Sequence, residues 1–185
     1  QKHEKKFNMS ALDEKTRYRN YEGAFYWLND AFLINIAYNT TEPNIGLGQR
    51  MDCNTLKCYF VDTGLLLSMT FNEKNIVNEE IYKKILFDKL SFNEGMILEN
   101  IVAQMLVCSN KKLYFFSRNE RDNQDETMEI DFLISKDKIT SKHNIIPIEV
   151  KSGTRYTFTS LKKIEKKYKD YLDKAIIIHT KDLSI

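Results

Sequence analysis

The sequence predicts an α/β fold in which a mixed central sheet is flanked by helices and preceded by an N-terminal helical segment. The first observation is an amphipathic helical period over 94–109, where Ile97, Ile101 and Met105 share one stripe. The second is a set of three strand-like segments that follow it, at residues 112–117, 129–134 and 145–151.

The third observation is a helix and a strand at the end of the chain. The pattern over 160–172 is helical, with Leu161, Ile164 and Tyr168 on its inner side, and the unbroken apolar run at 175–180 is typical of a buried strand. The predicted order is therefore αβββαβ, and its last β-α-β step is expected to make a right-handed crossover within one sheet.

The chain before this core has its own pattern. A helix is predicted at 18–31, then a strand at 32–39 and a loop at 40–49 that contains Pro43. This order fits the end of a winged-helix unit or a plain helical connector. Later come a strand near 57–60, a helix that Asp62 or Thr63 would cap, and a peripheral helix at 72–90. We expect residues 1–50 to be the partial winged-helix or connector segment and 51–185 to be the second domain.

Composition narrows the class of protein. A chain of 185 residues can bury one good core, and no apolar run reaches the ~18 residues of a membrane span. The three cysteines, Cys53, Cys58 and Cys108, form no CxxC pair. They indicate reduced thiols in a cytoplasmic protein that has no membrane partner.

The positive charge is concentrated in one segment. Between Lys136 and Lys169 ten basic residues stand against three acidic ones, a net charge of +7 within a chain whose total is +2. Such a segment suits a polyanion such as DNA, and a solvated helix face is the alternative. The lysines that could contact phosphates follow the third strand: Lys162, Lys163, Lys166 and Lys167.

Two of the predicted strands carry charges at alternate positions. Alternation puts Glu129 and Asp131 on one face of 129–134, and Glu149 and Lys151 on one face of 145–151. If the two strands pair as a hairpin, all four charges can share a side of the sheet. The apolar residues of the first strand would take the other side: Ile130, Phe132 and Ile134.

Clustered carboxylates indicate a cation site, because they repel each other unless a cation neutralises them. Oxygen ligands of this kind suit Mg²⁺ or Mn²⁺, which can activate water for attack on a phosphodiester. Lys151 would place a cation near the scissile phosphate, and Glu99, at the edge of the apolar arc of its helix, could reach the same side. The alternatives are a Glu–Lys ladder on an exposed sheet and a boundary glutamate without a role.

The motif resembles that of the PD-(D/E)XK nuclease superfamily. Asp131 is followed by seventeen residues and then by Glu149-Val150-Lys151, and the αβββαβ order is similar to the restriction-endonuclease-like core of that superfamily. Ile130 stands where the motif has proline. The resemblance implies Asp131, Glu149 and Glu99 as metal ligands for Mg²⁺ or Mn²⁺. It further implies Lys151 as the catalytic lysine and all four residues as the catalytic set.

A second resemblance covers nearly the whole chain. The stretches "KCYFVDTGLL", "GMILENIVAQML" and "IIPIEVKSG" are similar to the C-terminal region of a prokaryotic AAA+-type ATPase family, in which a nuclease-like domain of undefined function follows a P-loop domain and a winged-helix segment. The chain has no GxxxxGK[ST] motif, so the resemblance implies that an N-terminal ATPase domain is its partner. Two functions follow as expectations: metal-dependent phosphodiester hydrolysis on DNA, or an inactive nucleic-acid- or protein-docking module that regulates the ATPase half.

Overall fold

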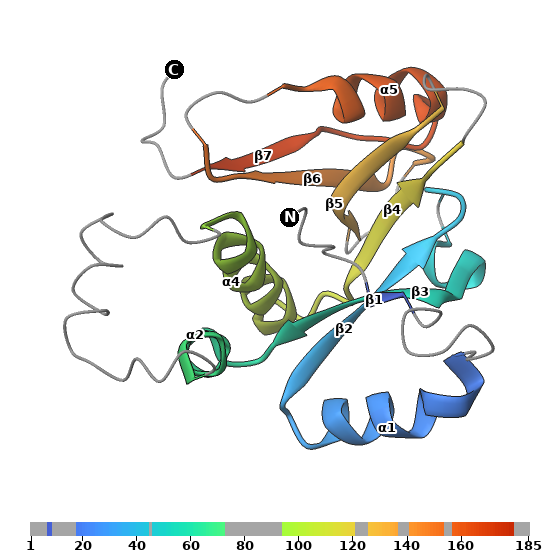
Figure 1. The fold of residues 1–185 in the computed structure, drawn as a ribbon. Coiled ribbons are helices and arrows are strands. Elements are labelled where there is room, and N and C mark those ends of the chain that lie inside the picture. The colour runs from blue at the N-terminus through green and yellow to red at the C-terminus, as the bar shows by residue number, and fades with distance from the viewer. Residues whose placement is uncertain are drawn as a thin grey trace.

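A single mixed sheet organises the chain in the computed structural model, which describes residues 7–8, 18–44, 46–72, 94–120, 126–136, 141–153 and 157–179. Seven strands form it: β1 Phe7–Asn8, β2 Ile34–Thr40, β3 Met51–Phe60, β4 Tyr114–Arg118, β5 Met128–Ser135, β6 Ile145–Lys151 and β7 Ile176–His179. Four α-helices lie within the same residues: α1 Tyr18–Asp30, α2 Thr63–Asn72, α4 Glu94–Cys108 and α5 Thr159–Tyr168 (Figure 1). A short 3-10 helix, η2, spans Leu47–Arg50.

The strands lie in the order β1-β3-β2-β4-β5-β6-β7. Two neighbouring pairs are parallel, β2 with β4 and β6 with β7, and the other pairs are antiparallel. The β2–β4 pair, with Tyr38 opposite Tyr114, joins the strands that precede α4 to those that follow it. The segment predicted as a connector therefore contributes β2 to the same sheet as the motif strands.

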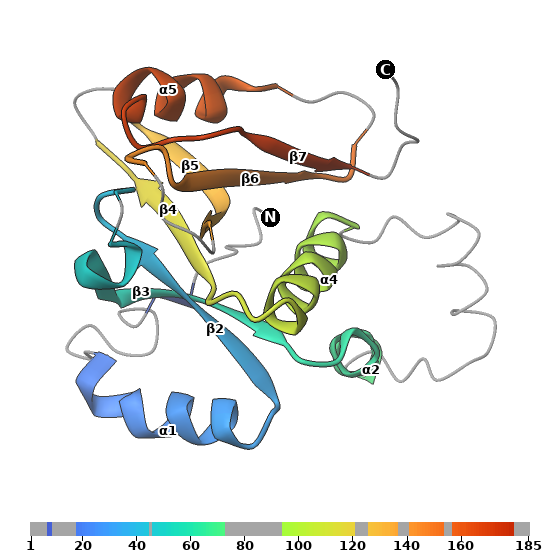
Figure 2. The same cartoon turned by 180° about the vertical axis from the view of Figure 1, so that it is seen from behind.

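Helices cover both faces of the sheet. In the two opposite views of Figures 1 and 2, α4 and α5 lie on opposite sides of β6 and β7, and α1 runs beside β2. The core on the α4 side contains Ala37, Tyr59, Val102, Ala103, Leu113, Phe115, Phe132, Ile146, Ile148 and Val150. The core on the α5 side contains Leu47, Phe116, Met128, Ile130, Leu133, Ile145, Leu161, Ile164 and Leu172. Burying each large apolar side chain stabilises the fold by about 1.5–3 kcal/mol.

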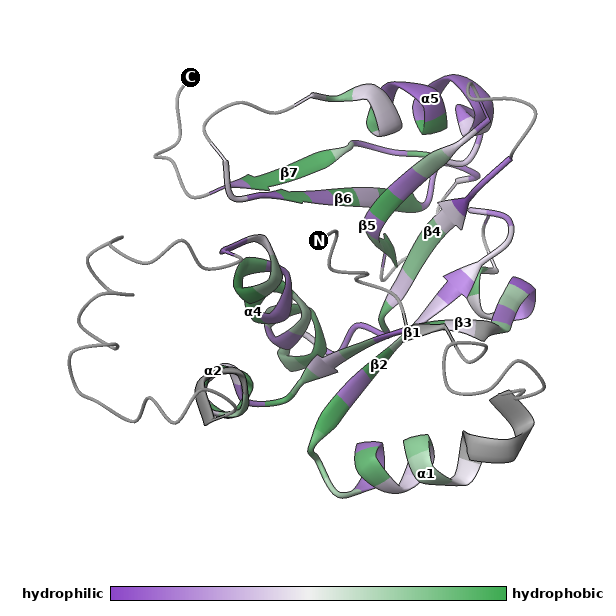
Figure 3. Cartoon of the chain, viewed as in Figure 1, coloured by the Kyte–Doolittle hydropathy of each residue, from purple (hydrophilic) through white to green (hydrophobic). Residues whose placement is uncertain are grey.

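The sequence pattern gives the reason for these layers. Figure 3 shows hydrophobic residues along α4 and β6, and a mostly hydrophilic α5. Both faces of β6 are covered, and six of its seven residues are buried. A strand buried on both faces is expected to be apolar throughout. Glu149 is therefore an exception that requires a partner.

The predicted element order agrees with the structure. The run α4-β4-β5-β6-α5-β7 reproduces the αβββαβ order, and the Asp62 carboxylate caps α2 by accepting hydrogen bonds from the N–H groups of Gly64 (2.6 Å) and Leu65 (3.3 Å). The strand predicted near 57–60 is longer and begins at Met51. The helix predicted at 72–90 lies outside the described residues beyond Asn72.

The helix predicted at 160–172 is shorter than expected and ends at Tyr168. Its continuation folds back onto β6 instead, because the carbonyl of Tyr171 accepts hydrogen bonds from the N–H groups of Asn144 and Ile145, both at 3.0 Å. The isolated bridge between Ile145 and Leu172 continues this contact. Pairing with β6 therefore replaces the last helical turn.

A β-bulge in β5 changes which residues face which helix. Tyr114 is opposite Leu133 and Phe116 is opposite Ile130, so β5 has one residue more than β4 over this stretch. As a result Ile130 and Leu133 pack on the α5 side, whereas Phe132 packs on the α4 side. The prediction that Ile130, Phe132 and Ile134 share one face is wrong for this reason.

Two further expectations concern the state of the cysteines and the presence of membrane-spanning helices. Cys53, Cys58 and Cys108 are free thiols. Within the described ranges, no helix has both the length and the apolar character that crossing a membrane requires.

Candidate functional site: a buried lysine among three carboxylates

A buried lysine lies at the centre of the acidic residues. Lys57 of β3 is 1% exposed, and its Nζ lies 3.2 Å from Oε1 of Glu129, 3.7 Å from Oδ1 of Asp131 and 4.0 Å from Oε2 of Glu99. These carboxylates come from β5 and α4, so three elements meet at one ammonium group. The ring of Phe115 lies beneath it, with Nζ 5.1 Å from the ring centroid.

Strand alternation in β3 explains why Lys57 points inward. Leu56 packs on the α1 side of the sheet, and Tyr59 packs in the core on the α4 side. Lys57 has the same parity as Tyr59, so its side chain is directed toward α4. A buried ammonium group loses its hydration and is strongly destabilising unless charged partners replace that hydration. The three carboxylates supply these partners.

Tyr59 extends the cluster toward α4. Its hydroxyl group donates a buried hydrogen bond of 3.5 Å to Oε2 of Glu99, and its ring lies 5.3 Å from that of Phe132. Burial raises the pKa of Tyr59 well above its usual value, and the negative charges of Glu99, Asp131 and Glu129 raise this pKa further. Tyr59 therefore remains a neutral donor to Glu99 over the physiological pH range.

Asp131 is held at the β-bulge. The paired register of β5 and β6 runs from Ser135 opposite Ile145 to Phe132 opposite Ile148. At the next position, Oδ2 of Asp131 accepts a hydrogen bond of 2.8 Å from the backbone N–H of Val150. This bond places the Asp131 carboxylate against the backbone between Glu149 and Lys151.

Glu149 and Lys151 form a separate ion pair. Glu149 is 2% exposed, and Lys151 is only half-buried. Burial raises the pKa of Glu149 above its usual value, the Lys151 ammonium group opposes this rise, and the negative charges of Asp131 and Glu129 add to it. Lys151 is thus the partner that favours the ionised form of Glu149 against the effect of burial.

The side chains of Glu129 and Asp131 lie on one face of the sheet, and those of Glu149 and Lys151 lie on the other. Ile146, Ile148 and Val150 pack in the core on the α4 side, and Ile145 packs on the α5 side. Regular alternation along β6 then directs Glu149 and Lys151 toward the α5 side. The prediction that Glu129, Asp131, Glu149 and Lys151 share one side of the sheet is therefore wrong. Glu129 and Asp131 meet Glu99 around Lys57, whereas Glu149 and Lys151 meet each other.

The charge and chemistry of the site fit a divalent cation, whereas the present spacing of the carboxylates is too wide to coordinate one. Glu99, Glu129, Asp131 and Glu149 bring four negative charges, and Lys57 and Lys151 bring two positive ones. Carboxylate oxygens are the ligands that Mg²⁺ prefers, at about 2.0–2.1 Å. As placed in the described chain, no three acidic, histidine or cysteine side chains surround one metal position. The carboxylates would have to draw together to hold an ion.

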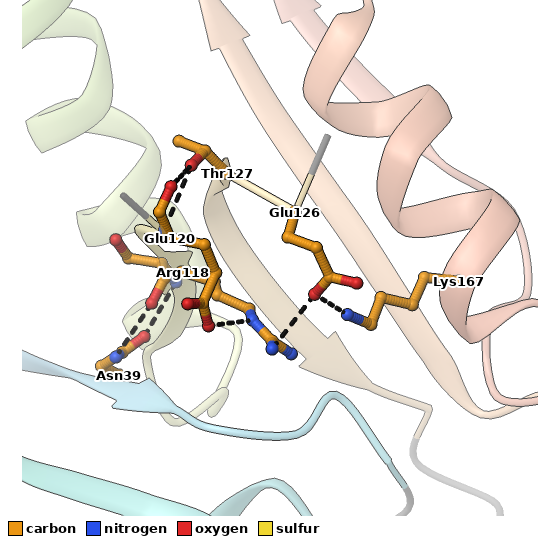
Figure 4. Close-up of polar contacts among 7 residues, drawn as sticks. Asn39, Arg118, Glu120, Glu126, Thr127 and Lys167 are labelled. Atoms are coloured by element: carbon orange, nitrogen blue, oxygen red, sulfur yellow. Dashed lines mark hydrogen bonds and ion pairs between the residues drawn. The ribbon is translucent and has the colours of Figure 1, made fainter. Parts of the chain in front are cut away.

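The predicted nucleic-acid lysines on α5 divide into two kinds. Lys163 donates a hydrogen bond of 3.0 Å to the backbone carbonyl of Thr127, and Lys167 pairs with Glu126, which also pairs with Arg118 (Figure 4). Lys162 and Lys166 are exposed.

Lys57 and Tyr59 are the site residues that the sequence reasoning missed. The available signal was a lysine inside the apolar strand "KCYFV", with Tyr59 at the same parity. A lysine in a strand normally lies on an exposed face or at an edge, so this signal alone did not separate a buried cation from a surface residue.

Two family models match the chain, one before the segment that precedes α4 and one from α4 onward. No curated protein and no solved structure matches the chain. Residues 1–75, which include Lys57 and Tyr59, match a family model described as a domain of unknown function (DUF8612). Residues 94–185, which include Glu99, Asp131, Glu149 and Lys151, match the model of another domain of unknown function (DUF4143), a domain found in AAA-ATPase-associated proteins.

Proposed function

We propose that the chain is a nuclease-like domain that hydrolyses phosphodiester bonds of DNA with Mg²⁺ or Mn²⁺. The observation that carries this proposal is the hydrogen bond from the Val150 N–H group to Oδ2 of Asp131, because it joins the two parts of the Asp…Glu-x-Lys motif. The αβββαβ order and the resemblance to the PD-(D/E)XK superfamily support it.

The chain supplies oxygen ligands and excess negative charge. Asp131 and Glu99, which meet around Lys57, would hold the ion, and Glu149 would join them by turning its side chain toward Asp131. The four carboxylates and two lysines carry a formal charge of −2, which one divalent cation would balance. When bound, such an ion supplies a more acidic water molecule and neutralises charge on the phosphate.

The protein groups have distinct roles in this proposal. Asp131 is oriented by the Val150 N–H group, so its other oxygen, Oδ1, has a defined direction. Lys151 is held by Glu149 and is partly open to solvent, and its ammonium group binds the scissile phosphate. The exposed Lys162 and Lys166 bind backbone phosphates on either side, which makes DNA binding weaker at higher salt.

The test is cleavage of supercoiled plasmid DNA by the wild-type chain in Mn²⁺. We expect nicked or linear products, and a loss of at least about a hundredfold in rate for Lys151→Ala and for Glu149→Ala. Glu165→Gln is the matched control, because Glu165 is an exposed acid on α5 outside the site. Equal rates in all four proteins, or no cleavage by the wild type, reject the proposal.

A second candidate function is a docking module that regulates an ATPase partner without cleaving DNA. The observation that favours it is Lys57, since its ammonium group already neutralises part of the charge of Glu99, Glu129 and Asp131. Thermal melting in Mn²⁺ separates the two functions. An ion present at 100 times its Kd adds about 2.7 kcal/mol to the free energy of unfolding, which raises Tm by several degrees. An unchanged Tm at millimolar Mn²⁺ favours the docking module.

A further inference from the structure

Lys57 occupies the place where the acidic residues concentrate negative charge. Its Nζ is within 4.0 Å of carboxylate oxygens of Glu99, Glu129 and Asp131, and its side chain is 1% exposed. The three carboxylates carry a formal charge of −3, which Lys57 reduces to −2. A buried cation is thus part of the site in the described chain.

The contacts of Lys57 are those of an exchangeable counter-ion. Charge-assisted hydrogen bonds between ammonium groups and carboxylates measure about 2.7–2.9 Å. The three distances here are 3.2, 3.7 and 4.0 Å, and among the described residues Nζ makes no hydrogen bond of good geometry. The ammonium group is therefore held by charge more than by directional bonds.

We propose that Lys57 is a built-in counter-ion that a divalent cation must displace, so that Lys57 sets the metal affinity of the acidic cluster. This inference rests on the metal site of the proposed function. Two cations cannot share the space between the same three carboxylates, because they repel each other at this distance. A lysine can leave such a position, since its ammonium group is on a flexible four-carbon stem.

Glu129 gives the displaced ammonium group a route outward. Its side chain is 38% exposed, whereas those of Asp131 and Glu99 are 11% and 3% exposed. Nζ is also closest to Glu129, at 3.2 Å. With a divalent cation held by Asp131 and Glu99, Lys57 would keep its contact with Glu129 and lie closer to solvent. The site is consequently stable without metal and binds metal more weakly than the same carboxylates would without Lys57.

The test compares the wild-type chain with two variants. Lys57→Met keeps an unbranched side chain of similar length and removes the charge, and Lys57→Arg keeps the charge. Without metal, we expect Lys57→Met to lower Tm by about 10 °C, because the buried carboxylates of Glu99 and Asp131 lose their cation. Titration with Mn²⁺ should then raise the Tm of Lys57→Met more than that of the wild type. Its Kd for Mn²⁺ should be lower by at least about tenfold.

Lys57→Arg should keep the wild-type response to Mn²⁺ more closely than Lys57→Met does. An unchanged Tm for Lys57→Met without metal, or an equal rise in Tm with Mn²⁺ in Lys57→Met and the wild type, overturns the inference. If Lys57→Met does not fold, the double variant Lys57→Met/Glu129→Gln is compared with the wild type instead. It restores the formal charge of −2 at the site around residue 57. It should fold and should bind Mn²⁺ more tightly than the wild type, and equal affinity overturns the inference.

These outcomes are independent of cleavage. A larger Mn²⁺ response in Lys57→Met, with no DNA cleavage by any of the proteins, supports the counter-ion and rejects the nuclease. Cleavage by the wild type, with the same Mn²⁺ response in both proteins, supports the nuclease and rejects the counter-ion.

Discussion

The Asp131 carboxylate accepts a hydrogen bond of 2.8 Å from the backbone N–H of Val150. This side chain satisfies a donor of β6 at the point where the bulge interrupts the regular pairing with β5. Asp131 is thereby fixed to the Glu-x-Lys segment, while its other oxygen lies 3.7 Å from Nζ of Lys57. One residue thus links the motif of the C-terminal half to a lysine of the N-terminal half.

The first prediction separates the structural role of Asp131, its hydrogen bond with Val150, from its proposed role as a metal ligand. Asp131→Asn keeps an oxygen that can accept from the Val150 N–H group, whereas Asp131→Ala leaves that buried N–H unsatisfied. We expect Asp131→Ala to be less stable than Asp131→Asn by about 1–3 kcal/mol in urea unfolding. Both variants should fail to cleave DNA. Equal stability of the two would show that the hydrogen bond contributes nothing to the fold.

The second prediction concerns the junction between β2 and β4. The side-chain amide of Asn39 imitates a backbone pair: its Oδ1 accepts from the Ser117 N–H group at 2.9 Å, and its Nδ2 donates to the Ser117 carbonyl at 3.4 Å (Figure 4). Asn39→Ala should lower the free energy of unfolding by about 1–3 kcal/mol, because both backbone groups of Ser117 lose their hydrogen bond to Asn39. Asn39→Asp is the matched control for geometry, since it keeps the acceptor and loses the donor. A variant Asn39→Ala as stable as the wild type would contradict this role.

The third prediction concerns thiol reactivity. Burial raises the pKa of Cys58 to about 11, whereas Cys53 and Cys108 are exposed. At pH 8, a thiol reagent should modify two cysteines rapidly and Cys58 more slowly by a factor of about a hundred or more, because the thiolate is the reactive form. Labelling followed by peptide mass spectrometry measures the three rates separately. Equally fast labelling of Cys58 would show that β3 opens readily.

The fourth prediction is a pH dependence at the surface of α5. The hydrogen bond from Lys167 and the positive charges of Arg118 and Lys167 hold the pKa of Glu126 below its usual value. A lowered pKa in the folded state contributes stability above the unfolded pKa of about 4.3, and this contribution is lost as the pH falls through the folded pKa. Glu126→Gln should therefore lower Tm by about 1–2 °C at pH 7 and low salt, and the difference from the wild type should vanish in acid.

Two controls apply to the Glu126 variant. The exposed acid Glu165 is also on α5, so Glu165→Gln measures the general effect of removing a carboxylate there. High salt should reduce the effect of Glu126→Gln, because surface ion pairs are screened. A Tm difference that persists at low pH would assign the effect to packing instead of charge.

The element order was predictable because its signals are local. The positions of α4 and β7 and the cap at Asp62 depend only on residues that are close in the sequence, and these positions agree with the structure. The predicted stripe of Ile97, Ile101 and Met105 is wrong as the buried face of α4, because Ile101 and Met105 are exposed and the helix buries Val102 and Ala103 instead. The strand β7, predicted to be buried, is half-buried. The bounds of α5 were less predictable, because its last predicted turn pairs with Ile145 of β6. A contact between distant segments has no signature in either segment alone.

The arrangement of the site was only partly predictable. Alternation correctly associates Glu149 with Lys151, and the helical wheel places Glu99 at the edge of the core. The bulge before Phe132 depends on the pairing of β5 with β4, so a rule based on strict alternation misplaces the residues around it. Lys57 depends on three elements meeting at one point, and no pattern within β3 reveals that meeting.

The most direct test of metal binding is a crystal of the chain soaked in Mn²⁺ and measured at a wavelength where manganese scatters anomalously. We predict an anomalous difference peak at about 2.1 Å from a carboxylate oxygen of Asp131, with Glu99 or Glu149 as a further ligand and Lys57 moved toward Glu129. Strong diffraction from soaked crystals with no anomalous peak within reach of Asp131, and with Lys57 still between the three carboxylates, would contradict the proposed metal-dependent nuclease.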